Sequence, residues 1–263
     1  MGGMNELRGR YASLQSGEWS AALTKPKALD TDAPEAREAA ALVAELGFDH
    51  FILIFRYVLP ALGPVQIVLS NWRTDWYERY WAKGYIQIDP IAARLLHSYR
   101  PFDWQDLGPL SPNQAAYFQD ARKHGMVDGF SGAVRFGSDQ AGFFSVGSEQ
   151  PRTREEKEHA MGRVLLHTAR LYERVQDHML ADYGVAPIAL TPRQREALHW
   201  TMRGVSRREA GRQMGCSENN FVRHQEAVRR KLGETNNLEA VRKAVAMNLI
   251  RPYDALVESE PPG

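Results

Sequence analysis

A guanidinium and a carboxylate stand three residues apart in the segment 218–232, at Arg223 and Glu226. In a helix, both would lie opposite an apolar stripe made of Phe221, Val228 and Leu232. An arginine can donate to O6 and N7 of guanine, and a glutamate can accept from N4 of cytosine. This pattern predicts base reading in the major groove, with a merely solvated charged face as the alternative. The residues predicted to contact DNA are Asn220, Val222, Arg223, Glu226, Arg230 and Lys231, the last two at phosphates.

Capping residues mark the helices that must position this segment. Three short polar residues each precede, by three positions, a side chain that can reach back, as in a capping box. The pairs are Thr191 with Gln194, Ser206 with Glu209, and Asn236 with Glu239. Gly204 and Gly215 follow apolar runs, where a helix needs a left-handed stop. The predicted helices span 192–203, 207–214, 218–232 and 237–249, and the middle two form a helix-turn-helix.

The charge of the chain is divided between two regions. Residues 190–251 carry 13 Lys and Arg against 6 Asp and Glu, whereas the remainder carries 20 against 26. The total of +1 therefore conceals a basic region joined to an acidic one. We expect the basic region to bind a polyanion with an affinity that falls as the salt concentration rises.

The basic region resembles the LuxR-type DNA-binding domain. The residues that match its pattern are Leu190, Thr191, Arg193, Leu198, Trp200, Gly204, Ser206, Glu209, Ser217, His224, Lys231, Leu232, Asn236, Glu239 and Ala240. The chain departs from the pattern at Gln194, where the family has Glu, and at Asn220-Phe221, where it has Thr-Val. Gln194 can still close a capping box, and the larger Phe221 requires local repacking. The resemblance implies a regulator of transcription.

An aromatic segment, residues 72–80, precedes a lone carboxylate at Asp89. Trp76 and Tyr80 stand four residues apart, and their rings offer apolar walls with polar tips. A carboxylate buried among such rings needs a hydrogen-bond donor. A small amphiphile with an amide N–H, two carbonyl groups and an apolar tail would satisfy this set. Two plainer interpretations remain: an aromatic stripe of the core, and Asp89 as the cap of a helix that begins at Pro90.

The region around this segment, roughly 35–175, resembles the autoinducer-binding domain of the LuxR-type quorum-sensing regulators. The residues that match its pattern are Trp76, Tyr80, Asp89-Pro90, Trp104 and Gly129. The resemblance implies that the ligand is an N-acyl-homoserine lactone. The run Ser131-Gly132-Ala133 is smaller than the usual apolar run of the family, which bears on the size of the pocket for the acyl tail.

The resemblance also implies a role for each matching side chain. Trp76 would donate to the lactone carbonyl, Tyr80 would donate to the acyl carbonyl, and Asp89 would accept from the amide N–H. Trp104 would wall the lactone ring, and Ser145 would add a hydroxyl near the amide.

The hydrophobic pattern predicts an α+β fold. Short β-branched and aromatic runs predict strands at 51–55, 65–69, 130–136 and 142–147. Helical patterns cover 34–46, 76–82, 90–99, 114–124 and 154–180. The last of these places apolar residues near heptad spacing, so it packs on the sheet or on a second copy of itself. These residues are Met161, Leu165, Thr168, Leu171, Val175 and Met179. We expect an α/β/α sandwich with a central antiparallel sheet, followed by an all-α four-helix helix-turn-helix domain.

The length of 263 residues accommodates two domains. We expect a ligand-binding domain over 1–180, a linker over 181–189 and a DNA-binding domain over 190–255, with frayed ends at 1–5 and 256–263. One recognition helix covers few base pairs, so the expected partners include a second copy of the chain on an inverted-repeat promoter site, the autoinducer, and RNA polymerase.

Several other classes are disfavoured by the composition. Cys216 is the one cysteine, which excludes an intramolecular disulfide framework, and the histidines lack metal-ligand spacing. No Gly-rich phosphate loop appears, so we expect neither an enzyme nor a bound metal or cofactor beyond the ligand. No apolar stretch approaches the roughly 20 residues that cross a bilayer, which favours a cytoplasmic location without a membrane partner.

Two alternatives belong to other functional classes. A response regulator with the same DNA-binding domain would need a phosphoacceptor Asp at the end of a parallel strand, and the strand at 51–55 ends without one. A regulator of the same fold could respond to a different small ligand or to none. The presence of Trp76, Tyr80 and Asp89 argues against the second alternative.

Overall fold

The computed structural model of the chain describes residues 12–13, 33–59, 63–98, 100–137, 140–182 and 187–251. The frayed ends expected at 1–5 and 256–263, and residues 183–186 of the expected linker, lie outside these ranges. The chain divides into two compact units, one containing most of the sheet and the helices beside it, the other the four C-terminal helices. Within the described ranges, no helix combines the length and apolar composition needed to span a membrane.

The first unit is built on an antiparallel sheet of six described strands in the order β1-β3-β2-β6-β5-β4. The strands are β1 (Ala12–Ser13), β2 (His50–Leu59), β3 (Gly63–Ser70), β4 (Phe102–Asp103), β5 (Asp128–Arg135) and β6 (Ala141–Ser148). The four strands predicted from the sequence are all present and each is longer than expected. The short strands β1 and β4 were not predicted, because two residues carry no periodicity.

Alternation along the strands gives the sheet two different faces. In β6, Phe143 belongs to a core cluster with Trp76 and Tyr80, whereas the ring of Phe144 packs against Phe130. Ser145 lies on the same face as Phe143 and pairs with Ile52 of β2. One face of the sheet therefore carries the side chains that line the candidate site.

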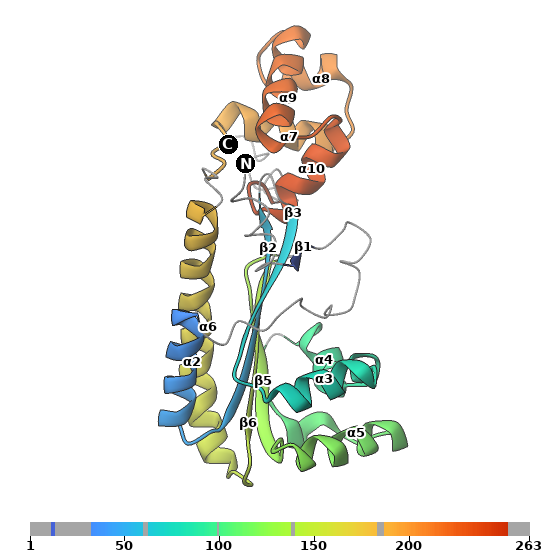
Figure 1. Cartoon of the computed structure of the whole chain (residues 1–263). Coiled ribbons are helices and arrows are strands. Elements are labelled where there is room, and N and C mark those ends of the chain that lie inside the picture. Colours follow the sequence, from blue (N-terminus) through green and yellow to red (C-terminus); the bar gives the residue numbers. More distant parts are fainter. Residues whose placement is uncertain are drawn as a thin grey trace, which may run out of the picture. The chain divides into compact units, whose positions relative to one another are not determined.

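Helices cover both faces, which confirms the expected α/β/α sandwich (Figure 1). On one side lie α2 (Pro34–Glu45) and α6 (Arg154–Asp182). On the other lie α3 (Thr74–Ala82), α4 (Pro90–Leu95) and α5 (Pro112–Lys123). Two 3-10 turns, η1 (Tyr85–Gln87) and η2 (Trp104–Leu107), complete this second layer. The helix expected over 90–99 ends at Leu95, and Ser98 beyond it bonds to the backbone of Arg100.

The buried stripe of α6 differs from the prediction in its first half. Thr168, Leu171, Val175 and Met179 are buried as expected, but Met161 and Leu165 are only half-buried. Their places are taken by the buried residues Ala160 and Val164, and one turn earlier by Lys157. The helix packs on the sheet: the Tyr57 hydroxyl donates to the carbonyl of Tyr172 over 2.8 Å.

The second unit holds the helices α7 (Pro192–Met202), α8 (Arg207–Gln213), α9 (Glu218–Leu232) and α10 (Asn237–Ala246). Its fold confirms the predicted four-helix arrangement. The helix expected over 237–249 ends at Ala246, because Asn248 adopts a left-handed conformation with φ of 56°. Gly204 and Gly215 have φ of 69° and 62°, as their roles as helix stops require.

The three predicted N-caps are present, but only one is a reciprocal capping box. Thr191 and Gln194 bond to each other's backbone N–H. Ser206 accepts from the N–H of Glu209, while the Glu209 carboxylate turns instead to Arg212. This hydrogen bond with Arg212 lowers the pKa of Glu209 to about 2. Asn236 also caps its helix without a reciprocal bond, since Glu239 pairs with Arg242.

Candidate functional site

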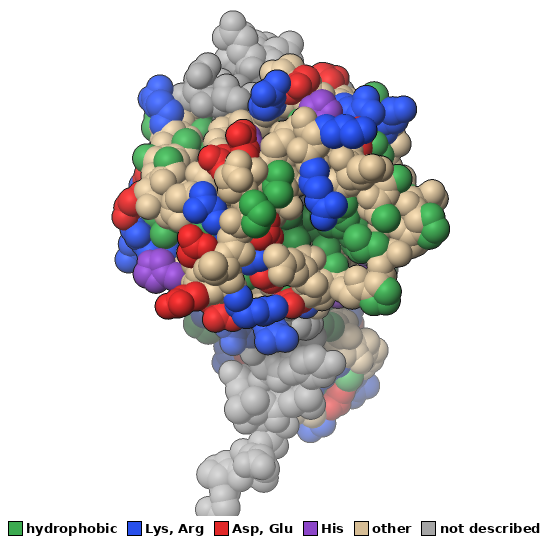
Figure 2. Space-filling view, turned by 90° about the horizontal axis from the view of Figure 1, so that it is seen from below, with side chains coloured by type: hydrophobic (Ala, Val, Ile, Leu, Met, Phe, Trp, Pro, Cys, Tyr) green, Lys and Arg blue, Asp and Glu red, His purple; other side chains and the backbone are tan. Residues whose placement is uncertain are grey.

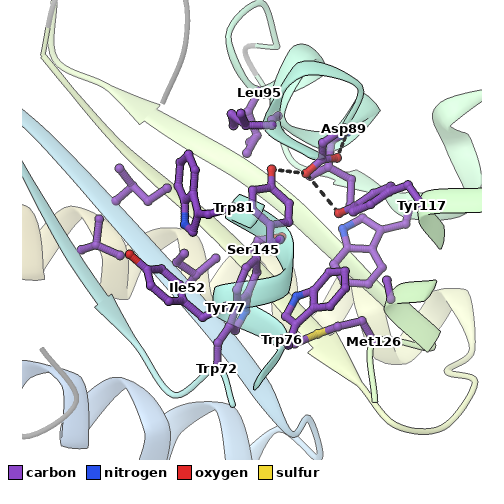
Figure 3. A pocket seen from close by; sticks show the side chains of 18 of the residues that line it. Ile52, Trp72, Trp76, Tyr77, Trp81, Asp89, Leu95, Tyr117, Met126 and Ser145 are labelled. Carbon is purple, nitrogen blue, oxygen red and sulfur yellow. Dashed lines mark hydrogen bonds between the residues drawn. The ribbon is translucent and has the colours of Figure 1, made fainter. Parts of the chain in front are cut away.

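A cavity of about 70 Å³ lies between the sheet and the helices α3, α4 and α5 (Figure 3). Its walls are mainly aliphatic and aromatic. They include Ile52, Ile54, Val68, Trp72, Tyr77, Trp81, Ile86, Leu95 and Met126. Among the described lining residues, Asp89 alone carries a formal charge. An apolar enclosure with a few polar groups at fixed positions is the usual form of a small-molecule site.

Asp89 is the polar centre of this cavity and is 6% exposed. Its Oδ2 accepts hydrogen bonds from the hydroxyls of Tyr80, over 2.9 Å, and Tyr117, over 3.1 Å. Its Oδ1 accepts from the N–H of Ile91 over 2.8 Å, which caps α4 ahead of Pro90. The two interpretations of Asp89 are therefore compatible: one oxygen caps a helix while the other meets two hydroxyls that line the cavity.

Burial controls the protonation of this group of side chains. It raises the pKa of Tyr80 well above its usual value, and the adjacent Asp89 carboxylate raises it further. Tyr117 is shifted in the same direction for the same reasons. Burial also raises the pKa of Asp89, while hydrogen bonds from Tyr80, the Ile91 N–H and Tyr117 oppose that rise. Both tyrosines thus stay protonated near neutral pH and serve as donors.

Trp76 contributes a donor without an acceptor. Its side chain is 1% exposed, and its indole Nε1 has no hydrogen-bond partner among the described residues. Trp76 and Tyr80 share a face of α3 because four residues separate them, and both line the cavity. A buried N–H without a partner costs about 1–3 kcal/mol, so an acceptor supplied by a ligand would be favoured there.

A chain of hydroxyls joins the sheet to η2. The Trp104 indole donates to Ser131 Oγ over 2.8 Å, and Ser131 Oγ lies 2.6 Å from Ser145 Oγ. Trp104 and Ser145 both line the cavity. The small Ser131, noted above as a departure from the family pattern, thus binds the ring of Trp104.

Gly129, the remaining predicted site residue, is not among the described residues that line the cavity. It lies in β5 beneath Trp104. A Cβ atom there would stand 2.2 Å from the carbonyl of Val146 and 2.8 Å from the Trp104 ring. Its missing side chain therefore lets Trp104 lie against the sheet.

Sequence reasoning did not single out Tyr117 or Met126. Tyr117 is buried in α5, donates to Asp89 and packs its ring against those of Tyr80 and Tyr85. Its helix was predicted, but nothing in the local pattern indicates that its inward face meets Asp89, 28 residues earlier. Met126, which also lines the cavity, follows the end of this helix.

In the second unit, α9 has the predicted inward face. Phe221, Val228 and Leu232 are buried, and Phe221 packs with Ala197, Ala210 and Met214. Gln225, which the prediction did not include, is also buried and donates to Thr201 Oγ1 over 2.7 Å. Asn220, Arg223, Glu226 and Arg230 are exposed and Val222 is half-buried. These five predicted residues remain accessible to a partner.

Lys231 differs from the other predicted DNA contacts. Its Nζ donates to the carbonyl of Ala189 over 2.7 Å and to Gln194 Oε1 over 2.9 Å. The same Gln194 oxygen receives the Thr191 N–H in the capping box. Lys231 therefore ties the end of α9 to the start of α7.

We expect Lys231→Met to lower the melting temperature of the C-terminal helices by about 4 °C or more. The reason is the loss of two hydrogen bonds from one ammonium, worth about 1 kcal/mol or more. Circular dichroism of the full chain would measure it. Arg230→Met is the control, since both residues are exposed at the end of α9 but the Arg230 side chain has no hydrogen-bond partner among the described residues. An unchanged melting temperature for Lys231→Met, together with weaker DNA binding at low salt, would instead support the phosphate contact predicted from the sequence.

An apolar pocket with a polar centre, in a chain that also carries a helix-turn-helix with an exposed basic recognition helix, defines a ligand-binding regulator of transcription. The family comparisons agree. The autoinducer binding domain matches residues 36–175, and the domain described as bacterial regulatory proteins, luxR family, matches residues 189–244. The chain therefore belongs to the LuxR family of autoinducer-binding transcription regulators.

Individual relatives support this assignment. The transcriptional activator protein SolR of Ralstonia nicotianae is 30% identical over 219 residues, which cover 81% of this chain and 91% of SolR. The transcriptional activator protein LuxR of Aliivibrio fischeri is 24% identical over 218 residues, covering 78% and 84%. A crystal structure of Escherichia coli SdiA has the same fold, with a TM-score of 0.64, 21% identity and coverage of 94% and 96%. SolR and LuxR are both transcriptional activators and not enzymes.

Proposed function

We propose that the cavity binds an N-acyl-homoserine lactone and that the bound ligand controls the binding of the chain to promoter DNA. The observation that carries this proposal is the buried Trp76 indole N–H, which lacks an acceptor at the edge of an apolar cavity. A lactone carbonyl supplies that acceptor. Asp89 Oδ2 supplies an acceptor for the ligand amide N–H, and the aliphatic walls suit an acyl tail.

The remaining contacts follow the pattern of the family. Tyr80 would exchange its bond to Asp89 for one to the acyl carbonyl, because a hydroxyl has a single hydrogen to donate. Trp104 would wall the lactone ring, and Ser145 would place its hydroxyl near the amide. The ligand-binding domain would occupy 1–180 and the DNA-binding domain 190–255, joined by a linker over 181–189.

We further propose that the chain binds DNA as a homodimer at an inverted repeat and acts on RNA polymerase from there. In the part of the second unit that the structure describes, the recognition helix exposes Arg223 and Glu226 toward a partner. A single such helix reads too few base pairs for useful specificity, and paired helices match a two-fold site.

The ligand can be identified directly. We expect mass spectrometry of the small molecule extracted from the chain, expressed with lactones of graded acyl length, to recover one lactone preferentially. Trp76→Phe keeps an aromatic ring but removes the N–H, and should weaken binding of that lactone by about tenfold, the equivalent of 1.4 kcal/mol. Trp81→Phe is the control, since Trp81 also lines the cavity but has no buried N–H without a partner.

Two results would contradict this proposal. Extraction of a molecule without a lactone ring would support a regulator of the same fold with a different ligand. Equal affinities of wild type and Trp76→Phe would show that the Trp76 N–H does not meet the ligand.

A further inference from the structure

A buried ionic cluster lies outside the cavity. The ammonium of Lys157, on α6, is 2.7 Å from Asp103 Oδ2 and 3.0 Å from Asp128 Oδ1. All three side chains are at least 95% buried, with exposed fractions of 1%, 2% and 5%. The cluster joins three elements that are distant in sequence: α6 on one face of the sheet, the end of β4, and the start of β5.

Each carboxylate accepts a hydrogen bond from the backbone near Trp104. Asp103 binds the turn that contains Trp104, and Asp128 binds the strand against which the Trp104 ring lies. Asp103 directly precedes Trp104, and its Oδ1 caps the η2 turn by accepting from the N–H of Gln105 over 2.9 Å. Asp128 Oδ1 accepts from the N–H of Gly129 over 2.8 Å. Gly129 is the residue whose missing Cβ admits the Trp104 ring. The cluster thus fixes the segment that carries Trp104 and the strand on which the ring lies.

Trp104 separates two spaces. On one side it lines the cavity that holds Asp89, and on the other it lines an outer groove of about 450 Å³. Phe118 also lines both, and the outer groove is bounded further by Leu107, Leu110 and Arg122. On the face seen in Figure 2, apolar side chains gather in a hollow. Displacement of the Trp104 ring would join the cavity to the groove.

We infer that Lys157 is a positioning residue that holds Trp104 as a partition, and that the Lys157–Asp103–Asp128 cluster thereby limits the size of ligand that the cavity accepts. The assignment rests on the geometry of the cluster and on the membership of the chain in an autoinducer-binding family. It needs the proposed lactone only as a probe.

The geometry of the cluster depends on the charge of Lys157. One ammonium faces two carboxylates, so removing it leaves two carboxylates close together at a buried site. Backbone and side-chain donors satisfy the other oxygens: the N–H of Arg152 and the amide of Gln105 both reach Asp128 Oδ2. Uptake of a proton by one carboxyl relieves the repulsion, but both carboxyls still lose their hydrogen bonds to the ammonium, and we expect η2 or the start of β5 to move as a result. Both movements displace Trp104.

The first experiment needs no ligand. The full chain is labelled with 5-fluorotryptophan, and the ¹⁹F resonance of Trp104 is assigned by its absence in Trp104→Phe. We expect Lys157→Met to shift and broaden this resonance while that of Trp200, in the second unit, stays in place. Asp128→Asn should move the same resonance less, because it leaves the Lys157–Asp103 pair and an oxygen for the Gly129 N–H. Asp128→Asn also provides the test if Lys157→Met does not fold.

The second experiment measures selectivity. The probes are an N-acyl-homoserine lactone and an N-acyl compound with the same chain but a larger aryl ring in place of the lactone. In Lys157→Met the preference for the smaller ring should fall at least tenfold relative to wild type. Leu171→Ala is the control, since Leu171 is also fully buried on α6 and lies 14 residues beyond Lys157 along that helix. It should lower the melting temperature without changing the resonance or the preference.

The outcomes separate this inference from the proposed function. If wild type binds neither probe, the lactone proposal fails and the ¹⁹F result alone decides the inference. A Trp104 resonance that is unmoved in both cluster variants would overturn the inference. So would a fall in affinity that is equal for the two probes and matches that of Leu171→Ala.

Discussion

Asp89→Asn is expected to raise the ligand concentration needed for half-maximal response by at least tenfold. The carboxylate is buried and accepts hydrogen bonds from Tyr80 and Tyr117 at the edge of the cavity. An amide oxygen is a weaker acceptor than a carboxylate oxygen, and bonds to charged groups contribute about 1.5–3 kcal/mol. Each 1.4 kcal/mol corresponds to about one decade of dose.

In the ligand-free chain, Asn can still cap the helix, but its NH2 group cannot accept from Tyr80 and Tyr117 as Oδ2 does, so we expect some loss of stability without ligand as well. Thermal midpoints measured across a lactone titration therefore separate the two roles of Asp89. The increment produced by the ligand should shrink, since at a given ligand concentration the stabilisation of the folded state grows with the logarithm of the affinity. Tyr80→Phe, which removes only a hydroxyl, should have a smaller effect.

Asp120→Asn is a matched control. Asp120 is also a buried carboxylate that accepts from a tyrosine, with Tyr85 Oη 2.6 Å away, but it does not line the cavity. Its hydrogen bond with Arg79, and a further one from Tyr85, lower the pKa of Asp120 to about 2. Its replacement should destabilise the chain with and without ligand alike. If the ligand raised the thermal midpoint of Asp89→Asn as much as that of wild type, Asp89 would not be part of the binding site.

Arg223→Ala is expected to weaken binding to the preferred DNA site by about 1–3 kcal/mol and to relax the preference at one base pair in each half of an inverted repeat. Arg223 is exposed on α9, opposite the buried residues Phe221 and Val228. Loss of a bidentate contact to guanine has this magnitude and affects one position. Selection of binding sites from a random pool, followed by titration of the selected duplex, measures both quantities.

Arg230→Ala provides the contrast for this prediction. Loss of a phosphate contact should weaken binding to all DNA sequences alike. It should also reduce the dependence of affinity on salt by about one counterion. A selected site that is the same for Arg223→Ala and wild type would show that Arg223 does not face the groove. Binding of only one copy of the chain at saturation would contradict the proposed homodimer.

Features set by neighbouring residues were predictable from the sequence. The N-caps at Thr191, Ser206 and Asn236 depend on contacts across three positions, and all three are present. Trp76 and Tyr80 lie on one wall because both belong to one helix, and Asp89 follows at the start of the next. The position of Ser145 was expected only from the family resemblance, and alternation along β6 puts it on the same face as Phe143.

Features set by distant residues were not predictable in this way. The buried stripe of α6 begins with Lys157, and a hydrophobic pattern assigns a lysine to the exposed face. Lys157 is buried because it pairs with Asp103 and Asp128, which lie far away along the chain. The stripe was therefore assigned to Met161 and Leu165 instead of Ala160 and Val164. The contact of Lys231 with Ala189 was not predicted for the same reason, since it crosses 42 positions.

The polar end of the cavity discriminates unequally between chemical groups. Asp89 already receives two hydroxyl protons, so a molecule without an N–H leaves no buried acceptor unsatisfied there. The Trp76 indole has no such substitute, and any occupant that shields it from water without offering an oxygen leaves a bare N–H behind. The cavity is thus more tolerant of a missing amide N–H than of a missing acceptor oxygen, and a ligand with an ester in place of the amide should be accepted more readily than one with a methylene in place of the carbonyl that meets Trp76.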